Sequence, residues 1–233
     1  MRIVRNSLLL CTVVMGVLLP AHAQLFRSTS KVGTTAAQFL KIGVGARAIA
    51  MGGAQVGMTD DISAIYWNAA ALSRSNQSSE LTFNHVNWIA DINYDFAAGM
   101  MQIGELGTFG LSIISMRTPE ELVRTVDAPE GDGRKWDASS IAFGLSYARN
   151  LTERFSIGLT AKYVRENIWS ESANGFAMDF GTLYMSEIKG LSLGASISNF
   201  GTKMQLAGRD LQFNNDPNDN IGSGPNNIPA DFR

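Results

Sequence analysis

From residue 80 onward the chain alternates large and small side chains with a period of two residues, which is typical of β-strands. The clearest case runs from Ser139 to Arg149, where Ile141, Phe143, Leu145 and Tyr147 alternate with Ala, Gly and Ser residues. Successive side chains of a strand point to opposite faces of the sheet. One face of this strand is therefore bulky and apolar, while the other face is small.

Further segments show the same alternation, each of about 8 to 14 residues, the length of tilted membrane strands. They are Leu81–Trp88, Ile92–Met100, Thr108–Ile114, Phe155–Tyr163, Phe176–Tyr184 and Leu191–Ser198. We expect a phase slip near His85, and Ile114 breaks the alternation of its segment. In the segment that begins at Ile92, the large residues again form one row: Ile92, Tyr94, Phe96, Ala98 and Met100.

A soluble β-sandwich would also alternate, with large residues inward and charged residues outward. Here the second face carries Gly, Ser, Ala and Thr, and charged residues make up 17% of the chain, against roughly a quarter in a soluble domain. This fits an inner wall that is crowded by a plug or faces water, and an outer wall that faces lipid. We therefore expect an all-β fold, a transmembrane antiparallel β-barrel, with the sandwich as the alternative.

The links between these segments alternate between short and long, as periplasmic turns and extracellular loops do in outer-membrane barrels. The short links are Gly104–Glu105, Asn150–Arg154 and Lys189–Gly190, and the long ones are Thr118–Asp137, Trp169–Asn174 and Ala207–Ile228. The link at 89–91 departs from this alternation, because it is short where a long extracellular loop is expected. Seven strands are expected in 80–233, and an eighth begins at Pro229. Because single-chain bacterial barrels have even strand numbers, we interpret 80–233 as the N-terminal half of a longer barrel; a complete eight-stranded barrel is the alternative.

Residues 1–23 have the features of a cleaved export signal. Arg2 and Arg5 precede an apolar run from Leu8 to Leu19, and an A-x-A cleavage site ends at Ala23. The apolar run is too short for a transmembrane helix, which needs about 20 residues. Cleavage removes the only cysteine, and Cys11 is a poor lipoprotein anchor because the large Leu10 precedes it. We expect the protein in the outer membrane of a Gram-negative cell, in contact with its lipid.

The net charge of the chain limits the classes of molecule that it can bind. The formal net charge is −2, which excludes a nucleic-acid binder that relies on a basic surface.

Residues 24–79 do not alternate. Small residues dominate the stretches from Ala36 to Ala54 and from Asp60 to Leu72, and small side chains allow backbone to pack closely against backbone. We expect this segment to form a hatch, or plug, in the lumen of the barrel.

Four stretches of the chain resemble the PorV/PorQ family, relatives of the FadL outer-membrane transporters. They read FLKIGVGARAIAMGGA (Phe39–Ala54), DDISAIYWNAAAL (Asp60–Leu72), GLSLG (Gly190–Gly194) and SNFGTKM (Ser198–Met204). Where the family usually reads YWNPAGL, this chain has Ala69 and Ala71 in place of proline and glycine. The motif residues expected to matter in the hatch are Gly43, Gly45, Arg47, Met51, Gly52, Gly53, Asp60, Asp61, Tyr66, Trp67 and Asn68.

The resemblance implies a FadL-like barrel of fourteen strands with an N-terminal hatch. It also implies a non-enzymatic component of type IX protein secretion, which receives secreted cargo proteins and works with other secretion components. The kinship with FadL implies an alternative function, the passive transport of hydrophobic small molecules across the outer membrane. An outer-membrane enzyme is a third class, which the shortage of catalytic residue types disfavours.

Several motifs that could bind a ligand or catalyse a reaction are better explained by structural roles. Gly43–Ala48 fits the dinucleotide pattern G-x-G-x-x-A, but that motif needs a preceding buried strand and a parallel sheet. Asp60 is expected to cap the short helix that holds Tyr66 and Trp67 rather than serve in acid–base work with Asp61. His85 has no nucleophile pattern beside it. The oxygen-rich loop Asn214–Asn220 lacks the spacing of a calcium-binding EF-hand. We therefore expect no catalytic, cofactor-binding or metal-ligating residues.

Overall fold

The computed structural model describes residues 35–58, 61–188, 190–214 and 227–229. Contacts divide the chain into two units, Met1–Thr35 and Ala36–Arg233. All the helices and strands of the described residues lie in the second unit. The expected export signal and the first residues of the expected hatch lie outside the described residues.

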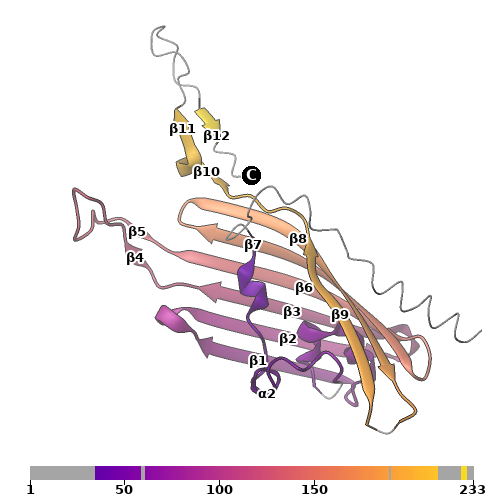
Figure 1. Cartoon of the computed structure of the whole chain (residues 1–233). Helices are drawn as coiled ribbons and strands as arrows, with labels where there is room; N and C mark the ends of the chain where they lie inside the picture. Colours follow the sequence, from indigo (N-terminus) through magenta and orange to yellow (C-terminus); the bar gives the residue numbers. More distant parts are fainter. Residues whose placement is uncertain (1–34, 59–60, 189, 215–226, 230–233) are drawn as a thin grey trace, which may run out of the picture. The chain divides into compact units, whose positions relative to one another are not determined.

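An eight-stranded antiparallel sheet dominates the described chain (Figure 1). Its order is β1-β2-β3-β6-β7-β8, and both β9 and β10 pair with the far edge of β8. The strands are β1 Ser79–Asn87, β2 Asn93–Ile103, β3 Gly107–Arg117, β6 Ala138–Asn150, β7 Phe155–Ile168, β8 Glu171–Met185, β9 Ser192–Gly201 and β10 Ala207–Gly208. The expected strands and their antiparallel arrangement are therefore confirmed.

Two short hairpins stand apart from this sheet. β4 Glu121–Leu122 pairs with β5 Lys135–Trp136 within the long link between β3 and β6. β11 Gln212–Asn214 pairs with β12 Asn227–Pro229. Pro229 therefore ends a strand of this hairpin rather than opening a further strand of the large sheet, and residues 230–233 lie outside the described chain.

The helices of the described residues are all short. They are η2 Gln38–Lys41, α2 Ala46–Ala50, α3 Ala64–Trp67, η3 Ala69–Arg74, η4 Ile89–Asp91, η5 Gly104–Leu106 and η6 Arg209–Leu211. None of the helices described has the length and apolar character needed to cross a membrane. The first four belong to residues 36–74, here called the N-terminal segment, which lies against one face of the sheet. We call this the covered face and the opposite one the open face.

The strands alternate between these two faces with few interruptions. Residues of β1 alternate regularly from Ser79 to Asn87, so the phase slip expected near His85 does not occur. Ile114, which broke the alternation of large and small residues, points to the covered face and is buried in the core. Its size reflects contact with the N-terminal segment rather than a change of direction in the strand.

In β2 the large residues lie on the covered face, not on the side expected to meet lipid. The residues concerned are Tyr94, Phe96, Ala98 and Met100, all of which are buried. The Tyr94 hydroxyl donates a hydrogen bond to the Ile42 carbonyl oxygen at 3.0 Å, and the Phe96 ring meets the Tyr66 ring edge-on at 6.4 Å. The N-terminal segment supplies apolar partners here, so the bulky row of β2 faces inward.

The sheet is open within the described residues. There, β1 pairs only with β2, and β9 pairs only with β8. The core lies between the N-terminal segment and the covered face, where Phe39, Leu40, Ile65 and Leu72 pack against residues of β2, β3, β6, β7 and β8.

Candidate functional site

The N-terminal segment contacts the sheet most closely at three glycines. A Cβ atom added at Gly158 of β7 would lie 2.1 Å from the Ala70 nitrogen. At Gly181 of β8 it would lie 2.1 Å from Asn68 Oδ1, and at Gly194 of β9 it would lie 2.2 Å from the Val56 oxygen. Any larger residue would push the segment off the sheet, so these positions require glycine.

Asn68 links the segment to the sheet. Its Nδ2 donates hydrogen bonds to the carbonyl oxygens of Val56 at 2.7 Å and of Thr182, in β8, at 3.0 Å. Its Oδ1 accepts from the Ala70 nitrogen at 3.1 Å. The side chain is almost fully buried. Because each of its polar atoms has a partner, Asn68 fixes both the turn between α3 and η3 and its position on β8.

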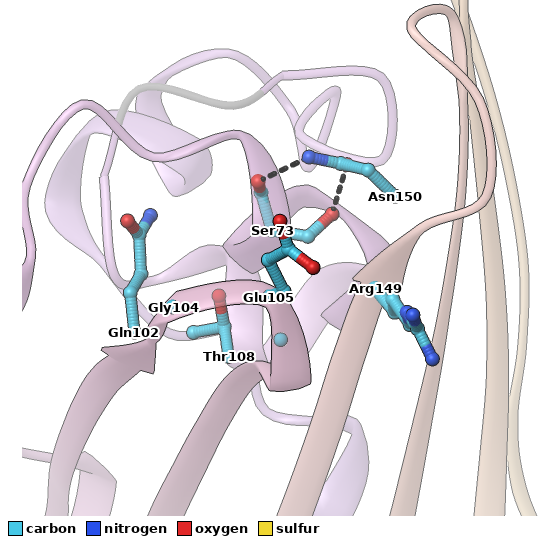
Figure 2. A pocket seen from close by; sticks show the side chains of 8 residues that line it. Ser73, Gln102, Gly104, Glu105, Thr108, Arg149 and Asn150 are labelled. Carbon is cyan, nitrogen blue, oxygen red and sulfur yellow. Dashed lines mark hydrogen bonds between the residues drawn. The ribbon is translucent and has the colours of Figure 1, made fainter.

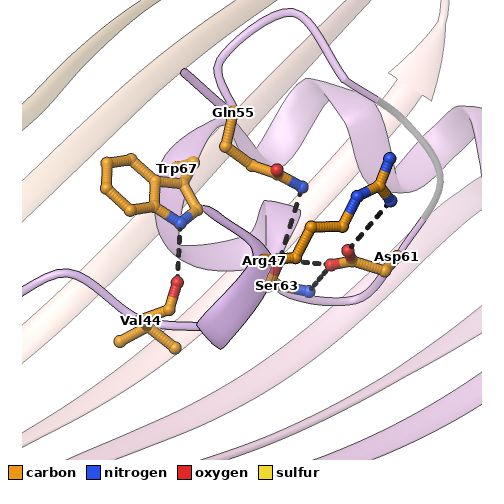
Figure 3. Close-up of polar contacts among 6 residues, drawn as sticks. All are labelled: Val44, Arg47, Gln55, Asp61, Ser63 and Trp67. Atoms are coloured by element: carbon orange, nitrogen blue, oxygen red, sulfur yellow. Dashed lines mark hydrogen bonds and ion pairs between the residues drawn. The ribbon is translucent and has the colours of Figure 1, made fainter. Parts of the chain in front are cut away.

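The aromatic pair of the segment is fixed by hydrogen bonds to backbone. The Tyr66 hydroxyl donates to the Leu40 oxygen at 2.8 Å, and the Trp67 indole nitrogen donates to the Val44 oxygen at 2.9 Å (Figure 3). Burial raises the pKa of Tyr66 to about 12, and the negative charge of Asp179 adds to the effect. Tyr66 therefore remains a neutral hydrogen-bond donor throughout the physiological pH range.

The glycines of the family motif shape the segment around Trp67. A Cβ at Gly43 or at Gly53 would lie 3.3 Å from the indole ring. Gly45, Gly52 and Gly53 adopt positive φ angles of 86°, 67° and 83°, which L-residues with side chains rarely adopt. Gly43 follows the 3₁₀ helix η2 rather than a strand. The preceding strand that a dinucleotide site needs is therefore absent here.

A polar cluster holds the turn that leads into α3 (Figure 3). Asp61 Oδ1 accepts a hydrogen bond from the Ser63 nitrogen at 2.7 Å and another from the Ser63 hydroxyl. Arg47 Nη1 lies 3.8 Å from Asp61 Oδ2, and Gln55 Nε2 donates to Ser63 Oγ at 3.4 Å. The N-cap residue of α3 is Ser63, which makes no side-chain capping hydrogen bond. Asp60, the cap expected from the sequence, lies outside the described residues.

Met51 is exposed, unlike the motif residues that pack around Trp67 and Asn68. Its side chain and that of Ile49 are exposed at the end of α2. The motif residues thus divide into a packed group around Trp67 and Asn68 and an exposed group around α2.

The far end of the segment is bound to the turn between β6 and β7 (Figure 2). Arg74 Nε donates to Ser156 Oγ at 2.7 Å, and its Nη2 donates to the Thr152 oxygen at 3.0 Å. Asn150 and Ser73 exchange two hydrogen bonds, of 2.7 and 3.0 Å. Beside this clamp lies a polar hollow of about 360 Å³. It is lined by Ser73, Gln102, Gly104, Glu105, Gly107, Thr108, Arg149 and Asn150.

A buried ion pair lies on the covered face. Lys162 Nζ is 2.6 Å from Asp179 Oδ2, and both side chains are at least nine-tenths buried. Asn199 completes the group, because its backbone nitrogen donates to Asp179 Oδ1 at 2.7 Å and its Oδ1 accepts from Lys162 at 2.9 Å. The group spans β7, β8 and β9 where the pairing of β8 and β9 is shifted between Met178 and Phe180.

This ion pair and the three close-contact glycines were not predicted from the sequence. The signal for the ion pair was visible, since Lys162 and Asp179 are charged residues in the middle of two strands whose neighbouring covered-face positions are mostly small. The glycines carried no such signal, because the same face has many small residues and only the contact distinguishes them.

No cluster of three or more His, Cys, Asp or Glu residues that could hold a metal ion occurs in the part of the chain that the structure describes. His85 Nδ1 lies 2.7 Å from Asp95 Oδ1, and both side chains are partly exposed on the open face. The oxygen-rich loop Asn214–Asn220 lies outside the described residues apart from Asn214.

The open face presents rows of apolar side chains that run across the sheet. One row consists of Phe83, Ala97, Ile113, Phe143, Tyr163 and Phe176, and the next of Leu81, Gly99, Leu111, Leu145, Ala161 and Met178. A polar row borders them, made of His85, Asp95, Ser115, Arg165 and Asn174, with Ile141 as its one large apolar member. Phe83, Leu81 and Phe176 are more than 60% exposed.

Together these features define a class of protein: an antiparallel β-sheet whose own N-terminal segment covers one face and whose other face is apolar. The chain matches the family model described as "Type IX secretion system protein PorV" over residues 26–229. It therefore belongs to the PorV family, as its motifs indicated, and membership associates it with type IX secretion and with the outer membrane. Among curated proteins, none matches the chain.

Proposed function

We propose that the protein is a non-enzymatic outer-membrane component of type IX secretion that receives and hands on secreted cargo proteins. The observation that carries the proposal is the family match, which spans the N-terminal segment and every strand of the large sheet. The polar contacts of the N-terminal segment hold it on the sheet, and this supports a structural role for the segment rather than a catalytic one.

The open face supports contact with lipid. Soluble proteins rarely expose contiguous apolar patches of more than a few hundred Å², whereas an apolar band is what a transmembrane barrel presents to hydrocarbon. In this proposal the sheet is part of a closed FadL-like barrel, for which the family resemblance implies fourteen strands. The polar row from His85 to Asn174 would then mark one border of the band.

The covered face supports a hatch that stays in place. Asn68 and Arg74 bind backbone oxygens of β8 and of the turn between β6 and β7, and Gly158 and Gly181 receive the segment without a gap. Displacing the segment would leave several buried polar groups without partners, each at a cost of about 1–3 kcal/mol. Cargo is therefore handled by the ends and loops of the barrel, with the hatch seated.

Deletion of the gene tests the secretion function. We expect the deletion strain to retain type IX cargo inside the cell and to regain secretion when the wild-type gene is restored. Normal secretion combined with lost uptake of fatty acids or hydrocarbons would replace this proposal with passive transport of hydrophobic small molecules.

Phe143→Arg tests the assignment of the open face to lipid. Phe143 is 45% exposed in the middle of β6, and an arginine near the bilayer midplane costs about 2–4 kcal/mol of folding free energy. The measurement is urea unfolding of protein folded in lipid vesicles.

Val126→Arg is the matched control for this variant. Val126 is 99% exposed between β4 and β5, so arginine there should change the stability by no more than about 0.5 kcal/mol. Equal effects of the two variants would contradict the lipid-facing assignment.

A further inference from the structure

The open face is not uniformly filled, because β2 carries small residues where its neighbours carry large ones. A hollow of about 590 Å³ lies over β2, between β1 and β3. Leu81 and Phe83 form one wall, Leu111 and Ile113 form the other, and Ala97 and Gly99 form the floor. This groove follows from the inverted order of β2, whose large side chains are used on the covered face.

The position of the Leu81 wall depends on the absence of a side chain at Gly99. A Cβ atom at Gly99 would lie 2.8 Å from Cδ2 of Leu81, so a larger residue there would displace the wall. Ala161, the other small residue of the same register row, lies between the large open-face residues Leu159 and Tyr163 of β7 and does not line this groove.

The dimensions of the groove favour a single hydrocarbon chain. Adjacent strands lie about 4.8 Å apart, so the walls stand on strands separated by about 9.6 Å, and their side chains occupy part of that width. An α-helix with side chains is about 10–12 Å wide and does not enter such a space. The backbone of Ala97 and Gly99 pairs with β1 on one side and with β3 on the other, so the floor offers no free hydrogen-bonding edge to a protein strand.

Along the groove the lining residues change from apolar to polar and charged, as the parts of a lipid change from acyl chain to headgroup. The next open-face row beyond Phe83 and Ala97 holds the His85–Asp95 pair, and the row after that holds Arg117. Both ring nitrogens of His85 already have partners, Asp95 Oδ1 at 2.7 Å and Asn87 Oδ1 at 3.2 Å. Arg117 is exposed, and a guanidinium group donates hydrogen bonds to phosphate oxygens. The apolar groove therefore leads to a charged end, which complements an acyl chain attached to a phosphate-bearing headgroup.

We propose that the groove over β2 binds one acyl chain of a phosphate-bearing membrane lipid, with the phosphate of the headgroup at Arg117, one register row beyond the His85–Asp95 pair. The inference rests on the proposed function, since it requires the open face to meet lipid. It goes further in assigning a defined lipid site to one part of that face.

Native mass spectrometry of the full chain tests the proposal. The protein is folded into vesicles of phosphatidylethanolamine and phosphatidylglycerol, extracted in mild detergent and measured with its retained lipid. We expect wild type to retain one lipid and Ala97→Phe, which fills the groove, to retain about tenfold less, the factor that loss of roughly two buried methylene groups gives.

Ala161→Phe is the matched control, since it places the same new side chain on the open face outside the groove, and it should behave as wild type. Ala97→Leu serves in place of Ala97→Phe if the larger variant does not fold, with the same expected direction. Equal retention by wild type and the filled variants, or equal loss in Ala161→Phe, overturns the proposal, as does a co-purified polypeptide occupying the site.

A second arm tests the headgroup. Wild type should retain phosphatidylglycerol in preference to diacylglycerol, which lacks the phosphate, and Arg117→Gln should lose that preference; a wild type without preference overturns the headgroup assignment. The outcomes remain distinct from those of the proposed function. A chain that does not insert into vesicles refutes the membrane assignment, whereas a chain that inserts without retaining lipid refutes only the groove.

Discussion

The N-terminal segment meets two regions of the same sheet in opposite ways. Over β2 it packs side chain against side chain, with Phe96 against Tyr66 and with Tyr94 bonded to the backbone of Ile42. Over β7 the backbone of Ala69 and Ala70 lies directly on Gly158, and over β8 the side chain of Asn68 lies directly on Gly181. The size of the residues on each strand is thus set by what lies across from them.

The open face shows the opposite distribution of large and small residues. β6, β7 and β8 use small residues on the covered face and direct residues such as Phe143 and Phe176 outward. β2 does the reverse and leaves Ala97 and Gly99 outside. Three variants test whether these two regions of the sheet are packed as differently as the structure indicates.

Phe96→Ala should have the largest effect. The side chain is almost completely buried beneath Tyr66, and truncation of a buried phenylalanine costs about 3–5 kcal/mol, because a cavity adds to the lost transfer free energy. Urea unfolding in lipid vesicles measures the loss. The paired variant is Phe176→Ala on the open face, where solvent or lipid fills the space and the cost is about 2 kcal/mol. Equal losses would mean that β2 is not packed as described.

Gly158→Ala should have the intermediate effect. The new methyl group would meet the backbone of Ala70, which cannot move alone, and overpacking of this kind costs about 1–3 kcal/mol. At Gly175, on the covered face of the neighbouring strand β8, the nearest atom to a new Cβ is in the flexible side chain of Met204. We therefore expect Gly175→Ala to be milder in the same assay and to leave residues 36–74 protected from protease, whereas Gly158→Ala exposes them.

Arg47→Ala should have the smallest effect. The guanidinium lies 3.8 Å from Asp61 and is half exposed, and ion pairs of this kind contribute about 0–1 kcal/mol. Thermal unfolding at low and high salt measures the change. A loss as large as that of Gly158→Ala would show that the exposed part of the segment is held as firmly as the part on β7 and β8.

The strands could be predicted from the sequence because a period of two residues is a local property that survives whatever packs against it. Which face carries the large residues of β2 could not be predicted, because the answer lies in Tyr66 and Ile42, far away in the chain. The same holds for the contact between Asn68 and Thr182, which are 114 residues apart. The small residues of the family motif indicated close packing, but their partners became visible only in the folded sheet.

The clamp between Arg74 and the turn after β6 has a consequence for the order of assembly. The arginine emerges early in synthesis, yet Ser156, its partner, comes 82 residues later, and Thr182, the partner of Asn68, later still. The N-terminal segment therefore cannot take its final position until the strands up to β8 have been synthesised and have paired. Until then its core side chains, among them Phe39, Leu40 and Leu72, have no sheet to pack against, so they have to be kept from other apolar surfaces while the strands assemble.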